Sequence, residues 1–443
     1  MRYTVLGAAA SGVAAAVLAK RTGHEVFVSE YKAEAAYPQA VETFRDLRID
    51  CEFGGHTERV FDCDRIITSP GIKPSSPVLT EARRRGIPVI SELEFGYEHS
   101  THTIIAITGT NGKTTTTALT AYVLNKGGRK AVACGNIGTP LSAIVLDTPD
   151  DTVLVVECSS YQLDATVTFR PHIAVFLNLT PDHLEYHGSV ENYRAAKWKI
   201  CANQGPSDIL ISCVDDAEAA SVPSTVKSSV LSFSVNRPVQ PGMFVREGDL
   251  VFATSHKEEI LMSTRDVRLP GVHNVYNSMA AALAARCLEI RNEDLRDSLA
   301  SFSGVEHRLE YVRTIRSTEF INDSKATNVN ATWYAVQSFS KPVILIAGGR
   351  GDRNDYGLLD EAVRKHVTCI VCMGEEQQAI FDHFCTLVRC IKADSMADAV
   401  SLAFEQALGD DIVLFSPACK SFDMFMNYEH RGDVFKEAVN ALV

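Results

Sequence analysis

A phosphate-binding loop motif constrains this chain more than any other feature of its sequence. An apolar run at residues 104–107 leads into Thr108-Gly109-Thr110-Asn111-Gly112-Lys113-Thr114-Thr115. A strand that enters a glycine-containing loop and then a helix directs backbone N–H groups, a lysine and a hydroxyl at one space. Nucleotide phosphates fit such a space, so the motif predicts ATP binding on an α/β scaffold.

The loop departs from the G-x-x-x-x-G-K-[ST] pattern at its first position, which is Ile107. Its functional end is intact, because Lys113 should reach the β- and γ-phosphates and the Thr114 hydroxyl should ligate Mg²⁺. A glycine-rich turn without a ligand is the alternative. The ATP-binding residues predicted here are Gly109, Thr110, Asn111, Gly112, Lys113, Thr114 and Thr115.

Length, charge and cysteine content narrow the class of protein. A chain of 443 residues exceeds what one hydrophobic core usually serves, and we expect three domains. The net charge of -12 argues against a nucleic-acid or acidic-membrane partner. No signal peptide or membrane-length apolar run is apparent, and the 12 cysteines form no paired framework, so we expect a cytoplasmic protein. Cys369 and Cys372 have redox or zinc spacing, but their apolar surroundings favour a buried strand.

The first residues predict a βαβ unit. A strand leads to Gly7-Ala8-Ala9-Ala10-Ser11-Gly12, a helix runs through Lys20, and a second strand, Val26–Ser29, ends at Glu30. This arrangement binds a nucleotide diphosphate at a helix N-terminus. A tight turn with no ligand remains open, because the glycine pattern departs from G-x-G-x-x-G.

The fold class predicted from these patterns is α/β, with three successive modules that have parallel-sheet character. Strands are expected at 152–156, 173–177, 343–347, 369–372 and 412–415, with shorter β runs at 230–267 and an alanine-rich helix at 274–289. The domains are a Rossmann-like N-terminal domain at 1–101, a central P-loop ATP-binding domain at 102–303 and a Rossmann-like C-terminal domain at 304–443.

Two strand ends beside the loop carry candidate metal ligands. Glu157 follows the apolar run 153–156, where a second Mg²⁺ ligand belongs in a P-loop domain, although a solvated glutamate is the plain alternative. His183 and His187 have the i, i+4 spacing of a zinc pair. Nearby Pro181 and Gly188 make a continuous helix uncertain, so both readings stay open.

Motifs in all three predicted domains together resemble the Mur ligase family. They are Thr108–Thr115, Glu157–Leu163, Asp182-His183, Tyr193–Lys197, Gly271–Asn274 and His307-Arg308. The run Asp323–Asn328, with Ser416–Cys419 and Arg431–Phe435, resembles the branch of the family that adds D-glutamate.

The resemblance implies an ATP-dependent, ADP-forming amide ligase of cytoplasmic peptidoglycan precursor synthesis. It would join D-glutamate to UDP-N-acetylmuramoyl-L-alanine through an acyl phosphate, as a monomer with no nucleic-acid or membrane partner. ATP and two Mg²⁺ ions are the implied cofactors. In the family a lysine placed like Lys197 is carbamylated and helps hold metal with His183, whereas the sequence alone favours a solvated Lys197. The implied catalytic residues are Lys113, Glu157, His183 and Lys197, and the implied metal ligands are Thr114, Glu157, His183 and carbamylated Lys197.

The resemblance also implies substrate contacts in each domain. Positions resembling UDP-substrate contacts are Ser11, Gly12, Glu30, Lys32, Ser69, Gly71 and Asn136. Further ATP contacts are Asn274, Arg308, Asp323 and Lys325. Amino-acid contacts are Thr327, Arg353, Ser421, Phe422 and Tyr428.

One position departs from the family pattern. Where a basic residue often meets the side-chain carboxylate of D-glutamate, an ungapped alignment places Asp352. An aspartate there would repel that carboxylate, so either Arg353 takes the role after a one-residue loop shift or the specificity differs. We favour Arg353.

Three other functions compete with this interpretation. A sister ligase that adds a diamino acid, or extends folate with glutamate, would share the loop, Glu157, His183 and Lys197, but the Asp323–Asn328 run favours the D-glutamate branch. An oxidoreductase would use Gly7–Gly12 and leave the P-loop without a purpose. A non-catalytic ATP-binding regulator would have no need of the metal-ligand candidates.

Overall fold

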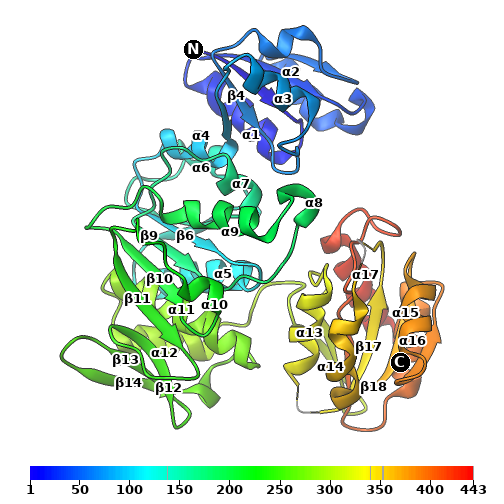
Figure 1. Cartoon of the computed structure of the whole chain (residues 1–443). Helices are drawn as coiled ribbons and strands as arrows, with labels where there is room; N and C mark the ends of the chain where they lie inside the picture. The colour runs from blue at the N-terminus through cyan, green and yellow to red at the C-terminus, as the bar shows by residue number, and fades with distance from the viewer. Residues whose placement is uncertain (137, 340, 352–353, 443) are drawn as a thin grey trace. The chain divides into compact units, whose positions relative to one another are not determined.

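The chain folds as an α/β protein with three mostly parallel sheets, which confirms the predicted fold class (Figure 1). The computed structural model describes residues 1–136, 138–339, 341–351 and 354–442. The chain divides into two compact units: Met1–Asp266 with Tyr276–Ala300, and Val267–Val275 with Ser301–Val443. The first unit holds two sheets and the second unit holds the third. The domain boundaries predicted at 101/102 and 303/304 stay predictions.

The first sheet contains the predicted βαβ unit. Its strand order is β3-β2-β1-β4-β5, and every pairing is parallel. Gly7 has φ 100°, and a Cβ on Gly12 would lie 1.9 Å from the Gly7 carbonyl oxygen, so close packing of the turn against the helix requires this glycine pair. The elements are β1 Arg2–Leu6, α1 Ala10–Arg21, β2 Glu25–Glu30, α2 Pro38–Asp46, β3 Asp50–Phe53, β4 Arg65–Thr68, α3 Pro77–Arg84, β5 Val89–Ser91 and α4 Glu92–Glu98.

The second sheet places the phosphate loop between two parallel neighbours. Its order is β14-β13-β12-β11-β10-β9-β6-β8-β7, so β6 lies between β9 and β8. The strands are β6 Ile104–Thr108, β7 Ala131–Gly135, β8 Val153–Glu157, β9 Ile173–Phe176, β10 Ile209–Cys213, β11 Ser229–Ser234, β12 Gly242–Arg246, β13 Asp249–Ala253 and β14 Glu258–Ser263. The helices are α5 Lys113–Lys126, α6 Leu141–Ile144, α7 Ser160–Asp164, α8 Leu184–His187, α9 Val190–Trp198, α10 Ala217–Ala220, α11 Val272–Cys287 and α12 Asn292–Ser301. The β-rich stretch predicted at 230–267 is the edge β11 to β14, which ends in antiparallel pairs.

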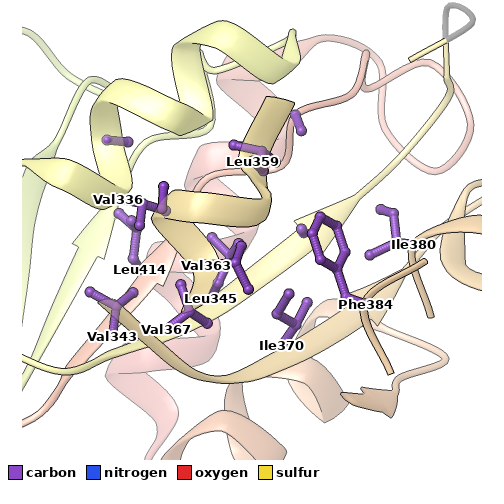
Figure 2. Packing of buried hydrophobic residues seen from close by; sticks show 14 of the residues in the cluster. Val336, Val343, Leu345, Leu359, Val363, Val367, Ile370, Ile380, Phe384 and Leu414 are labelled. Atoms are coloured by element: carbon purple, nitrogen blue, oxygen red, sulfur yellow. The ribbon is translucent and has the colours of Figure 1, made fainter. Parts of the chain in front are cut away.

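The third sheet has the order β15-β16-β20-β17-β18-β19, with one antiparallel pair at the β15 edge. One face is covered by a core that includes Val336, Leu345, Val363, Ile370 and Leu414 (Figure 2). The strands are β15 Glu310–Ile315, β16 Thr318–Asn322, β17 Val343–Gly348, β18 Val367–Met373, β19 Arg389–Lys392 and β20 Ile412–Phe415. The helices are α13 Val329–Gln337, α14 Asp360–His366, α15 Gln377–Phe384, α16 Met396–Gln406 and α17 Tyr428–Ala441.

The cysteines of β18 are buried strand residues, as predicted. Cys369 belongs to the core on one face of the third sheet and Cys372 to the core on the other, so the two thiols cannot chelate one ion together. All twelve cysteines are free thiols. In the part of the chain that the structure describes, no helix has the length and apolar character that crossing a membrane requires.

Candidate active site

The phosphate loop occupies the carboxyl end of β6, where parallel strands direct their following loops to one edge. Gly112 caps α5 with φ 84°, and a Cβ there would lie 2.4 Å from the Asn277 Oδ1 atom. The Lys113 Nζ atom donates to the carbonyls of Gly109 at 2.8 Å and Thr110 at 2.7 Å. The predicted loop, lysine and helix start therefore have the geometry of a phosphate-binding site.

The neighbouring strand end holds the loop in place. The Asn178 Oδ1 atom accepts from the backbone N–H groups of Thr110 at 3.1 Å and Asn111 at 2.9 Å. The Thr110 hydroxyl lies 3.0 Å from the Tyr193 hydroxyl on α9. The loop is thus fixed by side chains from the regions after β9 and on α9, which gives it a preorganised shape.

Lys197 lies inside the site, although the sequence alone favours a solvated side chain. It is 1% exposed, and its Nζ atom donates at 2.7 Å to the same Gly109 carbonyl that accepts from Lys113. Burial lowers the pKa of Lys197 well below its ordinary value, and the charge of Lys113 lowers it further. The Nζ atom lies 4.8 Å from the centre of the Tyr193 ring. A buried lysine with a depressed pKa is a candidate for chemistry rather than for surface charge.

Glu157 ends β8 beside the loop and is 2% exposed. Its Oε1 atom accepts from the Asn136 side chain at 2.8 Å, whereas its buried Oε2 atom has no hydrogen-bond partner within the described residues. A buried carboxylate oxygen is costly unless a donor or a cation satisfies it. The Oε2 atom is therefore a candidate ligand for a divalent cation.

The two histidines after β9 point to different partners. His183 has φ 55°, its side chain is 42% exposed, and its Nε2 atom lies 3.5 Å from Asp182 Oδ2. His187 is buried and its Nε2 atom lies 2.9 Å from the Ser160 hydroxyl. No three His, Cys, Asp or Glu side chains among the described residues form a metal-binding group, so the structure gives the zinc-pair interpretation no support.

The first sheet carries a cleft of about 1050 Å³. Of the predicted UDP contacts, Glu30, Lys32, Ser69 and Gly71 line this cleft, and Ser11 and Gly12 lie on α1 outside its lining. The Glu30 carboxylate accepts from the backbone N–H groups of Ala8 and Lys32, both at 2.8 Å. Asn136 lies instead against Glu157, in the second sheet.

The second compact unit brings together the other predicted ATP contacts. Asp323 is buried at the end of β16, where it accepts from the Ser416 hydroxyl at 2.8 Å. Burial raises the pKa of Asp323 to about 6, against the lowering charge of Arg308. Burial lowers the pKa of His273 to about 3, and the charge of Arg308 lowers it further. His273 is next to the buried Asn274. Lys325 lies 5.2 Å from the centre of the Tyr428 ring.

Of the predicted amino-acid contacts, Thr327 follows β16, Ser421 and Phe422 follow β20, and Tyr428 begins α17. Ser421 is buried, Phe422 is 59% exposed, and Thr327 and Tyr428 are partly exposed. Asp352 and Arg353 lie outside the described residues, so the choice between them stays a prediction.

Sequence reasoning gave no site role to several polar residues that shape these sites. Asn178, Asn277 and Tyr193 contact the phosphate loop; Asn178 follows β9, Asn277 lies within α11, and neither asparagine belongs to a motif. Arg431 is fully buried and donates to the Ser324 hydroxyl, the Ser324 carbonyl and the Cys419 carbonyl. The run Arg431–Phe435 named this arginine from the sequence, but not its buried position.

Comparison with known proteins finds three matched regions, and the phosphate loop, Glu157, His183 and Lys197 lie in the second of them along the chain. The Mur ligase middle domain matches residues 107–285, the Mur ligase glutamate ligase domain matches residues 307–419, and the MurD N-terminal domain matches residues 5–78.

Full-length relatives share the same name. The UDP-N-acetylmuramoylalanine–D-glutamate ligase of Salinibacter ruber is 42% identical over 460 residues, which cover 100% of this chain and 98% of that protein. The enzyme of the same name from Koribacter versatilis is 41% identical and covers 100% and 97%.

Solved structures support the fold. Acinetobacter baumannii MurF has a TM-score of 0.62 at 17% identity and covers 98% of this chain and 93% of that one. Thermotoga maritima UDP-N-acetylmuramate–alanine ligase MurC has a TM-score of 0.61 at 18% identity and covers 100% and 99%.

Proposed function

We propose, because this chain belongs to the Mur ligase family, that it joins D-glutamate to UDP-N-acetylmuramoyl-L-alanine while ATP becomes ADP and phosphate. The full-length relatives carry the name of this reaction. The observation that most supports catalysis is the convergence of Lys113 and buried Lys197 on the Gly109 carbonyl. On the adjacent strand, the Glu157 Oε2 atom has no hydrogen-bond partner among the described residues. A binding protein without turnover would have no use for these buried charges.

The reaction must turn a poor acyl donor into a good one. The terminal carboxylate of the muramoyl substrate attacks the γ-phosphate of ATP, the bond from that phosphate to ADP breaks, and an acyl phosphate forms. The amine of D-glutamate then attacks the acyl carbon, and phosphate leaves as the amide forms and the amine loses its proton. Lys113 and the loop N–H groups would hold the transferred phosphate and offset its charge.

Mg²⁺ would be held by side chains that follow the strands beside the phosphate loop. Thr114, Glu157, His183 and, if carbamylated, Lys197 are the proposed ligands, and the unpartnered Glu157 Oε2 atom fits that role. When bound, Mg²⁺ would neutralise the phosphate oxygens. If carbamylated, Lys197 would add a carboxylate to this set, because its Nζ atom lies 2.7 Å from the Gly109 carbonyl of the phosphate loop.

Lys197 has the properties that carbamylation needs. Only a neutral amine attacks CO₂, and burial lowers the pKa of Lys197 so that the neutral form is favoured. A bond forms between the amine nitrogen and the CO₂ carbon, the nitrogen releases a proton, and a carboxylate results. The product places a negative charge beside the Lys113 ammonium group, and the attraction between the two charges stabilises it.

The substrate assignments complete the proposal. The UDP part would bind in the cleft of the first sheet, and the D-glutamate carboxylates would meet Arg353 and the loops that carry Thr327 and Ser421. We further propose that the enzyme acts as a monomer in the cytoplasm.

The deciding experiment measures phosphate release from ATP with UDP-N-acetylmuramoyl-L-alanine and each of D-glutamate, L-glutamate, meso-diaminopimelate and L-lysine, with product masses. We expect release and a heavier product with D-glutamate alone. Turnover with another amino acid would retain the ligase chemistry and overturn the specificity. Absence of turnover with all four would refute the proposed function.

Substitution of Glu157 by Gln tests the metal assignment. The amide keeps the shape of the side chain but removes the charge at the Oε2 position, so we expect kcat to fall about 10²- to 10³-fold and the Mg²⁺ concentration for half-maximal activity to rise. Steady-state kinetics over a Mg²⁺ series would measure both. Glu191→Gln on the exposed side of α9 is the control and should behave as wild type. An unchanged Mg²⁺ requirement in Glu157→Gln would contradict the assignment.

A further inference from the structure

Helix α4, which follows the last strand of the first sheet, has an N-terminal cap that it shares with the second sheet. Ser91-Glu92-Leu93-Glu94 has the pattern of a capping box, in which the glutamate side chain normally accepts from the N-cap N–H. The Ser91 hydroxyl does accept from the Glu94 N–H at 3.2 Å. The Ser91 N–H, however, donates to the Ala165 carbonyl at 3.0 Å. The Ser91 N–H therefore has its acceptor in the residue that follows α7, and not in the Glu94 side chain.

A second box in the same unit shows the ordinary arrangement. At the start of α7 the Ser159 hydroxyl accepts from the Gln162 N–H, and the Gln162 Oε1 atom accepts from the Ser159 N–H at 3.0 Å. The same unit can therefore form a complete capping box. At α4 the second half is missing because the Glu94 side chain bonds to other donors.

The Glu94 carboxylate is committed to the loop that follows α7. Its side chain is 0% exposed and accepts from the N–H groups of Val167 at 3.0 Å, Thr168 at 2.6 Å and Phe169 at 3.0 Å. The Thr168 hydroxyl donates to it as well, at 2.5 Å. A buried carboxylate is stable when such donors replace water. The buried carboxylate on α4 is therefore hydrogen-bonded by the loop at residues 167–169, which follows α7.

A second contact fastens α4 to α6. The Glu92 Oε1 atom accepts from the Ser142 N–H at 2.8 Å, and the Ser142 hydroxyl donates to the Glu92 carbonyl at 3.2 Å. At Gly96 a Cβ would lie 2.9 Å from Leu141 Cγ, so the two helices approach as closely as a glycine permits. Figure 1 shows α4 and α6 side by side at this junction. Helix α4 is thus held on the second sheet at two separate points.

This junction lies between the two sites that one substrate must reach. The cleft for the UDP part belongs to the first sheet, and α7 begins directly after the strand end that carries Glu157. A substrate anchored at its UDP end presents its carboxylate to the phosphate loop only if the two sheets keep a fixed orientation. Misplacement of reacting groups by about 1 Å can cost about 10²-fold in rate.

We propose that Glu94 is a positioning residue, which locks the UDP cleft of the first sheet to the phosphate loop of the second and so aligns the acyl carboxylate with the reacting phosphate. The inference rests on the proposed function. Glu94 touches neither substrate, and its effect would pass through the 167–169 loop and α7.

Substitution of Glu94 by Gln tests the proposal. The amide keeps the volume but replaces one acceptor oxygen with an NH₂ group facing N–H donors. We expect kcat/KM for UDP-N-acetylmuramoyl-L-alanine to fall about 30- to 100-fold. Calorimetric Kd values for UDP alone and for a non-hydrolysable ATP analogue should stay within about threefold of wild type, because each ligand binds one sheet. Glu98→Gln is the matched control, since Glu98 lies on the same helix but pairs with Arg65 inside the first sheet.

Two outcomes would overturn the proposal: an unchanged kcat/KM, or a UDP Kd that weakens in step with kcat/KM. If Glu94→Gln does not fold, Thr168→Val decides, because it removes the hydroxyl donor and leaves the three N–H donors. We expect about a three- to tenfold fall in kcat/KM with unchanged UDP affinity, and a wild-type value would refute the role. A wild-type enzyme that neither binds UDP nor turns over would count against the proposed function instead.

Discussion

Replacement of Lys113 by Met is expected to lower kcat by about 10³-fold or more. The ammonium group lies within 2.8 Å of two loop carbonyls, so its removal takes a positive charge directly from the phosphate loop. Charge that offsets a transferring phosphoryl group acts mainly in the transition state, so kcat should fall more than the affinity for ATP. Phosphate release and the Kd of a non-hydrolysable ATP analogue would separate the two effects.

The control is Lys126→Met at the opposite end of the same helix, where the side chain lies over the Tyr122 ring. That variant should retain wild-type rates. A Lys113→Met enzyme within about tenfold of wild type would show that the loop N–H groups are sufficient without the lysine.

Replacement of Lys197 by Ala is expected to lower kcat by about 10³-fold, because it removes both the buried amine and the carboxylate that carbamylation would create. The wild-type enzyme, equilibrated with isotope-labelled bicarbonate, should show a carbamate carbon signal that the variant lacks. Arg194→Ala, on the same helix but paired with Glu218 at the surface, should keep both the signal and the activity. A missing signal in an active wild-type enzyme would contradict the carbamylation proposal.

The activity of this site is expected to fall as the pH is lowered. The pKa of Lys197 is depressed in the folded protein, so the amine is protonated only when the pH falls through that lowered value. Protonation prevents the attack on CO₂, and activity should therefore be lost on the acid side. Added bicarbonate should restore part of that activity at a given acid pH. The buried environment therefore keeps the amine of Lys197 neutral over a wider pH range than an exposed lysine would have.

The sequence predicted the strands and helices that have a clear local pattern. It missed the features that depend on packing between residues far apart in the sequence. Strand β20 lies where the apolar run placed it, at Ile412–Phe415, and the helix after the phosphate loop begins at Lys113. The antiparallel pair β15 and β16 was not predicted, because β15 is largely exposed and neither strand has an apolar run as long as that of β20.

At the site, the local sequence around Lys197 did not predict that this side chain is buried. A basic residue among charged neighbours on a helix ordinarily predicts a solvated side chain. Its burial results from the position of α9 over the phosphate loop, and that contact joins residues 88 positions apart in the sequence. Only the family resemblance anticipated it. The exposed fraction of Phe422 and the partners of Arg431 likewise depend on loops that no local pattern describes.

The carboxylate of Glu30 has a consequence for selectivity among nucleotides. In a dinucleotide-binding turn, free N–H groups receive a pyrophosphate. Here the chain supplies its own anion to the Ala8 and Lys32 N–H groups. An acidic residue at the end of the second strand is also the position that contacts the ribose 2′-OH of NAD, so Glu30 disfavours NADP, with its 2′-phosphate, but does not disfavour NAD. The diphosphate of UDP would be left to cations such as Lys32 and Lys73 at the cleft wall, and recognition by mobile ammonium groups is weakened by ionic strength far more than recognition by a fixed backbone.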